Sequence, residues 1–316
     1  MSTSMIIFGA GLSGLIAARM LADRHPVVYE RQASLPNNHQ ALLRFRSSIV
    51  GDATNVPFKK VSVNKYILRG GPTANPISDA VAYSLKVTGK IHNRSIIDTR
   101  PVERFIAPPD FIKRLAATAE IHYGMDFLEW SPALVRPHGP LISTLPMPVM
   151  MDMFDWKDKP EFKQYAGWTI RAEVRPDLEC QVNATVYSPR PQDAWYRASL
   201  TGPALIVEGV GNGPSTTEEA MQSLRTACVA FGLETASLEH WNVTEAKYQK
   251  ISDLTSEERE SAKRFIMFLS EKHQIYSLGR FAVWRPKLLL DDLVNDVRVI
   301  ARMIEGQSQY HHKLES

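Results

Sequence analysis

Three glycines near the N-terminus carry the clearest chemical signal in the sequence. Gly9, Gly11 and Gly14 form a G-x-G-x-x-G pattern directly after the apolar run Met5–Phe8. In this pattern the first glycine permits a tight turn, the second lets the backbone approach a pyrophosphate, and the third lets a helix pack close to a strand. The helix that follows offers free N–H groups and the positive end of its dipole to phosphates. The pattern therefore predicts a binding site for the diphosphate of a dinucleotide.

An acidic residue completes this pattern. Glu30 lies 21 residues after Gly9, at the end of a second predicted strand, Val27–Glu30. A carboxylate at that point accepts hydrogen bonds from ribose hydroxyls, and it would repel the 2′-phosphate of NADP. The apolar spacing from about Ser13 to Arg24 predicts the intervening helix. Strand, helix and acid all lie where binding requires them, which disfavours a glycine-rich turn without a ligand.

A second segment, near the C-terminus, also combines a strand, a glycine and a following helix. Ile275–Leu278 reads as a strand that ends at Gly279-Arg280, and a helix with Asp291-Asp292 follows. The start of that helix is another anion-binding end. Taken alone, the segment is explained equally well by a turn with a surface arginine.

The elements that must position these residues follow from hydrophobic periodicity. After the first β-α-β unit, residues 32–75 are predicted to be rich in loops, and residues 81–99 to be strands. A helix is expected at Phe111–Thr118, and strands within 120–130 and at 140–145. Residues 166–208 are rich in predicted strands, and helices are expected at 216–231, 256–272 and 288–304.

This order of elements predicts an α/β fold made of two interleaved parts. One is a Rossmann-like nucleotide-binding domain, discontinuous over residues 1–75, 105–150 and 273–306. The other is an inserted antiparallel-sheet substrate or cap domain over residues 76–104 and 151–272. A plain NAD-binding domain would instead run as one block of alternating strands and helices.

Composition narrows the classes of protein. The chain has 316 residues, of which 44% are hydrophobic, and a net charge of only +3. We therefore expect a small-molecule substrate, no strong interaction with nucleic acid and no membrane partner. Cys180 and Cys228 lack metal-type spacing and are too few for a disulfide scaffold, so we predict no metal site and a cytoplasmic location. The sequence does not specify the oligomeric state.

The two glycine segments together resemble the flavoprotein superfamily with the glutathione-reductase-type FAD fold. The resemblance is to the branch of amine oxidases, protoporphyrinogen oxidase and UDP-galactopyranose mutase. It rests on the N-terminal pattern with Glu30-Arg31, the strand Leu141–Pro146, and Gly279-Arg280-Phe281-Ala282, which is most similar to the mutase version. It implies FAD as the cofactor, so the nucleotide-binding domain would be an FAD-binding domain. The matching motifs cover the cofactor pieces and are not specific for a substrate.

The resemblance implies a role for each matching residue. The residues implied to hold the pyrophosphate are Gly9, Gly11, Leu12, Ser13 and Gly14. Glu30 would bind the adenosine ribose, and the ADP moiety would lie near Arg31 and one of Arg44 or Arg46. The backbone of Phe127 would contact adenine, and Gly279 and Arg280 would reach the pyrophosphate and ribityl chain. Backbone N–H groups near Leu288–Leu290, with Leu288 and Leu289 foremost, would face the pyrimidine edge of the flavin.

Catalytic residues are harder to identify, because in such flavoproteins the flavin supplies the chemistry and the protein positions the substrate. Trp284 and Arg285 precede the flavin-facing helix and are candidates to lie near the isoalloxazine ring. Arg197 is a candidate anion-binding residue in the predicted strand 195–200. Strict alternation there places Tyr196 on the opposite face from Arg197 and Ser199.

A glycine-rich stretch at 208–214 superficially resembles a phosphate loop. Its spacing fits neither a P-loop nor a second dinucleotide fingerprint, and the P-loop lysine is missing. The segment Pro214–Thr216, with Glu218 and Glu219, is typical of a capped helix start. We therefore interpret the stretch as structural.

The sequence thus favours an FAD-dependent oxidoreductase that acts on a small polar or anionic metabolite at the flavin ring. Three alternatives stay open. The chain could be a flavoenzyme that modifies a nucleotide or a hypermodified DNA base. It could be a non-redox flavoenzyme similar to the UDP-sugar mutases. It could also be a non-catalytic sensor that binds FAD or NAD.

Overall fold

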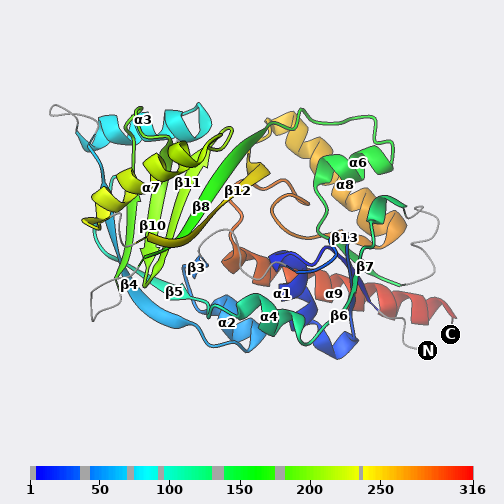
Figure 1. Ribbon diagram of the computed structural model, residues 1–316. Coiled ribbons are helices and arrows are strands. Elements are labelled where there is room, and N and C mark those ends of the chain that lie inside the picture. Colours follow the sequence, from blue (N-terminus) through cyan, green and yellow to red (C-terminus); the bar gives the residue numbers. More distant parts are fainter. Residues whose placement is uncertain are drawn as a thin grey trace.

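The structure is a computed structural model that describes residues 5–35, 43–69, 75–91, 96–129, 139–174, 182–234 and 238–315. Its framework consists of two sheets with helices around them (Figure 1). The five-stranded sheet has the order β13-β7-β1-β2-β6, and the eight-stranded sheet has the order β12-β8-β11-β10-β9-β4-β5-β3.

The five-stranded sheet is parallel throughout. Its strands come from distant parts of the chain, namely β1 (Ile6–Phe8), β2 (Val27–Glu30), β6 (Glu120–Tyr123), β7 (Leu141–Ser143) and β13 (Ile275–Ser277). Parallel neighbouring strands must be joined by crossover connections. The N-terminal, middle and C-terminal parts of the chain can therefore all contribute strands to this one sheet. The predicted assembly of these strands into one layer is confirmed.

Helices cover both faces of this sheet, because successive apolar residues of each strand point to opposite sides. Ile7, Val28 and Ile142 pack in a core with α1 (Leu12–Met20), α2 (Ile49–Thr54), α4 (Phe111–Ala116) and α9 (Leu290–Glu315). Ile6 and Phe8 pack in a second core with α6 (Met147–Met153) and α8 (Ser256–His273). Short 3₁₀ turns occur at η1 (Ala22–Arg24) and η2 (Phe127–Glu129).

The eight-stranded sheet forms the other half of the molecule. Its strands are β3 (Arg44–Phe45), β4 (Lys59–Ile67), β5 (Val102–Ile106), β8 (Gln164–Val174), β9 (Asn183–Tyr187), β10 (Trp195–Thr201), β11 (Ala204–Val210) and β12 (Leu238–Ile251). Only the β4–β9 pair is parallel. Helix α7 (Thr217–Phe231) covers one face through an apolar core around Trp168 and Trp195.

Helix α3 (Pro76–Thr88) packs on the opposite face of this sheet. Its Tyr83 lies edge-on to Tyr187 of β9, with ring centroids 5.5 Å apart, and it also packs with Tyr196 of β10. The prediction of strands over 81–99 is therefore wrong where it covers α3. The side chain of Asn75 accepts hydrogen bonds from the N–H groups of Ile77 and Ser78 and so caps the helix. Burial at helical spacing, rather than alternation, then determines the conformation.

The division of the chain into domains also needs correction. Strands β3 and β4 lie within 1–75, a region predicted to be rich in loops and part of the cofactor domain, yet both join the eight-stranded sheet. Helix α8 lies within the predicted cap, yet it packs on the five-stranded sheet through Phe265 and Leu269. The chain therefore crosses between the two sheets more often than predicted.

Across the part of the chain that the structure describes, no helix is long and apolar enough to span a membrane.

Candidate active site

The fingerprint glycines meet the conformational demands predicted for them. Gly9 has φ +95°, in the region that favours glycine, and a Cβ on it would lie 2.1 Å from Oγ1 of Thr144. A Cβ on Gly14 would lie 1.9 Å from the carbonyl oxygen of Gly9, so only glycine lets α1 pack this close to the turn. Gly11, in contrast, has open space around its Cβ position. The turn is thus crowded on the protein side and open at Gly11.

Glu30 fastens this turn. One oxygen of its carboxylate accepts a hydrogen bond from the N–H of Ala10 at 2.7 Å, and the other accepts one from the N–H of Gln32 at 2.9 Å. A carboxylate offers about four lone-pair sites, so two such bonds leave acceptor capacity on both oxygens. The predicted role in binding a ribose therefore remains compatible with the geometry, and Glu30 also holds the glycine turn in place.

The C-terminal glycine segment meets the N-terminal one in space. Gly279 has φ +100°, and a Cβ on it would lie 2.7 Å from Oγ of Ser13 in the first turn of α1. Arg280 follows, and its Nε atom is buried without a hydrogen-bond partner. Burial lowers the pKa of Arg280. The structure therefore joins Ser13, Gly279 and Arg280, which the sequence separates by more than 260 residues.

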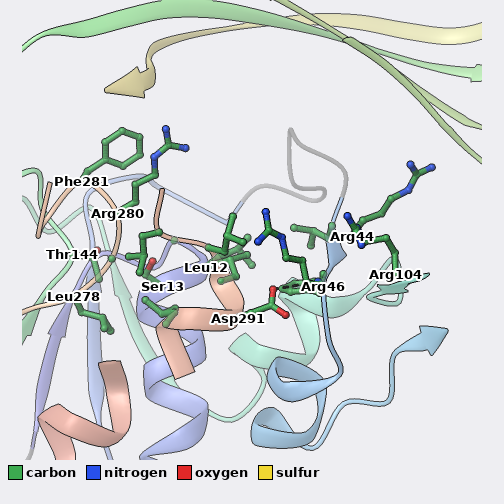
Figure 2. Close-up of a pocket in the computed structure, with 18 residues that line it drawn as sticks. Leu12, Ser13, Arg44, Arg46, Arg104, Thr144, Leu278, Arg280, Phe281 and Asp291 are labelled. Carbon is green, nitrogen blue, oxygen red and sulfur yellow. Dashed lines mark hydrogen bonds between the residues drawn. The ribbon is translucent and has the colours of Figure 1, made fainter. Parts of the chain in front are cut away.

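A cavity of about 580 Å³ opens at this junction (Figure 2). Residues predicted to bind the cofactor supply much of its wall, namely Gly11, Leu12, Ser13, Arg44, Arg46, Gly279, Arg280, Leu288 and Leu289. We call it the first cavity. Its size is typical of small-molecule sites, which span about 300–1,000 Å³.

The segment after β3 is held against the start of α9 by a contact that the sequence did not reveal. Oδ1 of Asp291 accepts hydrogen bonds from the N–H and the hydroxyl of Ser47, at 2.8 and 2.7 Å. Asp291 lies in the first turn of α9, where a carboxylate also stabilises the helix dipole. This contact sets Arg46 at the edge of the first cavity. A short-range motif could not predict it, because the partners are far apart in the chain.

Arg44 and Arg46 differ in their surroundings, although the sequence treated them as equivalent. The guanidinium of Arg44 docks on the larger sheet, where Nη1 donates to Oγ1 of Thr185 at 2.8 Å and Nη2 donates to the carbonyl of Leu200. Burial, followed by the nearby charge of Arg197, lowers the pKa of Arg44 to about 10. Arg46 is exposed. In Figure 2 its side chain and that of Arg280 both point toward the strands of the larger sheet. Arg46 is therefore the better placed of the two to meet a ligand.

Other predicted cofactor residues lie less directly at the site. Leu288 and Leu289 line the first cavity, but their N–H groups already donate to the carbonyl of Arg285 and to Oδ2 of Asp292, both at 3.0 Å. Those two N–H groups are therefore not open donors for a flavin edge, and the prediction is left to the N–H of Leu290, a residue that also lines the first cavity. Phe127 is buried beside Phe8, and Arg31 is exposed after β2; neither lines the first cavity.

Trp284 and Arg285 are the predicted catalytic pair. They line neither the first cavity nor a second cavity that adjoins it near helix α3. Trp284 is buried, packs against Phe162 with ring centroids 4.5 Å apart, and donates its Nε1–H to the carbonyl of Ser252. Arg285 is exposed and forms an ion pair with Asp296 of α9 at 3.0 Å. Core packing and a helix contact account for these side chains, so the structure does not support the predicted catalytic role.

A second cavity, of about 590 Å³, adjoins the first. The two share Arg46, Arg280 and Leu289 in their walls. Much of the remaining wall comes from helix α3 and the larger sheet, with Tyr83, Tyr165, Tyr187, Arg197 and Lys250, and the segment before α9 adds Pro286 and Lys287. The larger sheet therefore faces the junction of the glycine segments across this cavity.

A buried ionic network forms the floor of the second cavity. Arg197 of β10 pairs with Glu208 of β11, with Nη2 to Oε1 at 2.6 Å, and the hydroxyl of Tyr196 donates to the same oxygen at 3.2 Å. Burial pushes the pKa of Glu208 up, but the charge and hydrogen bonds of Arg197 outweigh it and hold that pKa below its usual value. Burial and the Glu208 charge raise the pKa of Tyr196.

This network overturns the predicted alternation in β10. The register shifts between Trp195 and Arg197, where an irregularity breaks the pairing with β11. Tyr196 and Arg197 can therefore both reach Glu208, instead of lying on opposite faces. Glu208 itself belongs to β11, and the glycine-rich stretch that follows leads to α7, whose N-cap Thr216 accepts a hydrogen bond from the N–H of Glu219. The predicted helix start at Thr216 is confirmed.

Lys250 is a site residue that the sequence did not single out. Its Nζ lies 3.8 Å from the ring centroid of Tyr196, a cation–π distance. It belongs to β12, a strand of 14 residues that was not predicted. Among the described residues, no cluster of histidine, cysteine, aspartate or glutamate is suited to hold a metal ion. Cys180 lies outside the described residues.

Comparison with known proteins gives matches at the level of structure. No model of a known protein family matches the chain, and no curated protein matches its sequence. Reduced UDP-galactopyranose mutase superposes with a TM-score of 0.69 at 14% identity, covering 96% of both chains. A candidate protoporphyrinogen oxidase from Exiguobacterium has a TM-score of 0.59 at 12% identity, covering 98% of this chain and 99% of that one. Aklavinone-11 hydroxylase, in a complex with FAD and aklavinone, has a TM-score of 0.53 at 12% identity, covering 96% and 61%.

The matches extend over nearly the whole chain, so they include the larger sheet as well as the glycine segments. At these identities a match shows shared architecture. The chain therefore has the fold of UDP-galactopyranose mutase and of the FAD-bound hydroxylase, which is the two-part flavoprotein fold that its glycine segments predicted.

Proposed function

We propose that this protein is an FAD-dependent oxidoreductase that acts on a small polar or anionic metabolite beside the flavin. The observation that carries the proposal is the meeting of the two glycine segments at one cavity. Gly279 approaches Ser13 so closely that a side chain would not fit, and Gly11 faces open space. Structures that share this fold include one with FAD bound.

Residues that line the first cavity, together with Glu30 beside the glycine turn, fit an FAD molecule. The open side of Gly11 leaves room for a pyrophosphate to reach the backbone, and the N-terminus of α1 supplies a positive dipole end beside it. The buried Nε of Arg280 lacks a hydrogen-bond partner, which an anionic cofactor would supply. Glu30 keeps acceptor capacity for ribose hydroxyls. We assign these four features to the ADP and phosphate part of the cofactor.

The second cavity supports an enzyme over a non-catalytic sensor. A sensor needs only the cofactor site, whereas a flavoenzyme needs room for a substrate next to the cofactor. The two cavities share a wall formed by Arg46, Arg280 and Leu289. The walls of the second cavity include the charged residues Lys90, Arg197 and Lys287. This polarity favours a hydrophilic substrate.

FAD, when bound, supplies hydride-transfer chemistry at its ring. The protein's own contribution is to bind, orient and enclose. The Glu208 network holds Arg197 in the floor of the second cavity. Tyr83 of α3 and Tyr187 of β9 form an aromatic wall of the same cavity.

Flavin content is the first test. The purified protein should be yellow, with flavin absorption that bleaches on anaerobic reduction. A library of polar and anionic metabolites should contain compounds that bleach the spectrum without an added reductant. A colourless protein that takes up NAD and not FAD would overturn the cofactor assignment.

Replacing Gly11 gives a clean variant for this test. Gly11 has φ −68° and ψ 175°, which any residue can adopt, and a Cβ would contact nothing within 4 Å. We therefore expect Gly11→Leu to fold normally while its side chain blocks the pyrophosphate, with flavin content reduced by about tenfold or more. Circular dichroism checks the fold, and absorbance of the purified variant measures the flavin. Normal flavin content in this variant would falsify the assignment of the first cavity.

A mutase-like, non-redox reaction is the second candidate. It is favoured by the TM-score of 0.69 with reduced UDP-galactopyranose mutase, which covers 96% of both chains. The two candidates differ in the fate of the flavin electrons. An oxidoreductase substrate bleaches oxidised flavin in one anaerobic turnover, whereas a mutase substrate is isomerised only after the flavin has been reduced.

A further inference from the structure

Asp291 brings a carboxylate to the wall of the cavity that is proposed to hold FAD. Among the described residues that line the first cavity, Asp291 alone is acidic. It lies in the first turn of α9, a helix end whose free N–H groups and dipole attract negative charge. Because the diphosphate of the proposed cofactor is itself anionic, a carboxylate in this wall would repel it. Cofactor binding alone therefore does not explain Asp291.

The hydrogen bonds of Asp291 leave its charge in place. Its carboxylate accepts from the N–H of Arg46 at 3.4 Å, and from the N–H and the hydroxyl of Ser47 at 2.8 and 2.7 Å. All three donors are neutral groups, and within the described part of the chain no lysine or arginine side chain forms an ion pair with Asp291. In Figure 2 the guanidinium of Arg46 points away from this carboxylate, toward the strands of the larger sheet.

The surroundings of Asp291 indicate which part of the cofactor it faces. The open side of Gly11 and the unpartnered Nε of Arg280 are assigned to the phosphates. Beside Asp291 the wall is apolar, with Leu289 and Leu290, and it suits an aromatic ring better than a phosphate. Asp291 is also half-buried, so its charge is screened less than a charge at the surface. The part of the cofactor that matches this wall is therefore the flavin ring.

Reduction changes the charge of a flavin ring. At mildly alkaline pH two electrons and one proton enter the oxidised ring, so the reduced ring carries one negative charge more. A charge placed near the ring is one of the means by which a protein tunes its electronic properties. The positive end of a helix stabilises the reduced, anionic ring, and a carboxylate at the same place opposes that stabilisation.

We propose that Asp291 lowers the reduction potential of the bound flavin, because its negative charge destabilises the reduced ring relative to the oxidised one. This inference deepens the proposed flavoenzyme function and rests on it. A lower potential makes the reduced cofactor a stronger electron donor. The site then favours the transfer of electrons to an acceptor over their retention on the flavin.

The midpoint potential of the FAD-loaded protein tests the proposal. The flavin is reduced anaerobically with xanthine and xanthine oxidase at mildly alkaline pH, beside a dye of known potential. Asp291→Asn removes the charge and keeps an oxygen that can accept from Ser47. We expect the equilibrium constant for reduction to rise about tenfold in this variant, which is about 30 mV for a two-electron couple. An unchanged potential would overturn the proposal.

Asp292→Asn is the matched control. Asp292 follows Asp291 in the first turn of α9, but it is exposed and does not line the first cavity. Its loss should change the equilibrium constant for reduction about twofold or less, because water and salt screen an exposed charge. A rise as large as in Asp291→Asn would overturn the proposal, since any charge at this helix end would then act alike.

Three more variants separate the charge of Asp291 from its contact with Ser47. Ser47→Ala removes one donor and leaves the carboxylate charged, so the potential should stay that of the unmodified protein. Asp291→Glu also keeps the charge and should keep the potential. Asp291→Ser is a second neutral variant, which should repeat the rise and which serves in place of Asp291→Asn if that protein does not fold. A rise in Ser47→Ala as large as in Asp291→Asn would assign the effect to lost positioning and overturn the proposal.

Flavin absorbance of the same samples separates this proposal from the proposed function. An unmodified protein that carries no flavin under saturating FAD overturns the proposed function, and the present inference with it. Flavin-loaded Asp291 variants that keep the potential of the unmodified protein overturn only the present inference.

Discussion

Glu208 illustrates how single residues stabilise the site. Its carboxylate is 9% exposed, and it accepts hydrogen bonds from Arg197 and Tyr196 across two strands. Loss of its charge leaves the Arg197 guanidinium, itself 38% exposed, without its counter-ion. Because water can solvate part of that guanidinium, we expect Glu208→Gln to lower the free energy of unfolding by about 1–3 kcal/mol, less than for a fully buried pair.

The pH dependence of this effect has a definite sign. The folded-state pKa of Glu208 lies below its usual value of 4.5. The folded protein thus binds this proton less readily than the unfolded chain, so the stabilisation is complete above the unfolded pKa and is lost as the pH falls through the folded one. Urea unfolding between neutral pH and about pH 3 should show a smaller loss of stability in Glu208→Gln than in the unmodified protein. Parallel curves for the two proteins would show that Arg197 does not hold the carboxylate ionised.

Helix α3 is the element on which the shape of the second cavity depends. Tyr83 and Thr88 of this helix line the cavity, and Lys86 anchors it to the larger sheet. The Lys86 ammonium donates to three carbonyl oxygens, those of Ser188, Arg190 and Trp195, at 2.7–3.2 Å. We expect Lys86→Met to lower the free energy of unfolding by about 1–2 kcal/mol, because these carbonyls lose their donor.

This anchor also predicts a measurable response to alkaline pH. Burial lowers the pKa of Lys86 to about 8, from an ordinary value of 10.5. Between these two values the unfolded chain binds more protons than the folded protein, so the free energy of unfolding should rise as the pH increases through this window. Lys86→Met should lack that rise when both proteins are unfolded with urea at a series of pH values. A rise of equal size in both would assign it to another group.

At the scale of the whole molecule, the two sheets should unfold together. Both sheets are built from N-terminal and later segments, and the first cavity is lined by residues from both ends of the chain. We expect one cooperative thermal transition, and FAD at about 100 times its dissociation constant should add about 2.7 kcal/mol to the free energy of unfolding. Scanning calorimetry at several FAD concentrations measures both effects. Two separate transitions, of which FAD moved only one, would show that the larger sheet folds independently.

The sequence by itself determined the N-terminal glycine turn of this protein. Gly9, Gly11, Gly14 and Glu30 lie within one β-α-β unit, so their spacing directly implies the turn that the structure shows. The strands around Leu141 and Ile275 were predictable for a similar reason, since short apolar runs between turns are local signals. The helical nature of α3 was missed, because its capping by Asn75 and its packing against the sheet outweighed the apparent alternation.

Only the tertiary structure decided which residues form the second cavity. Lys250, Lys287, Arg46 and Arg280 are scattered over more than 230 residues, and no spacing rule relates them. A strand irregularity at Trp195–Arg197 redirects Tyr196 toward Glu208, and core packing removes Trp284 from the site. A dinucleotide turn is a local structure that short-range sequence encodes, whereas a pocket between two sheets depends on long-range contacts. The fingerprint therefore predicts the glycine turn, and the fold determines which side chains line the two cavities.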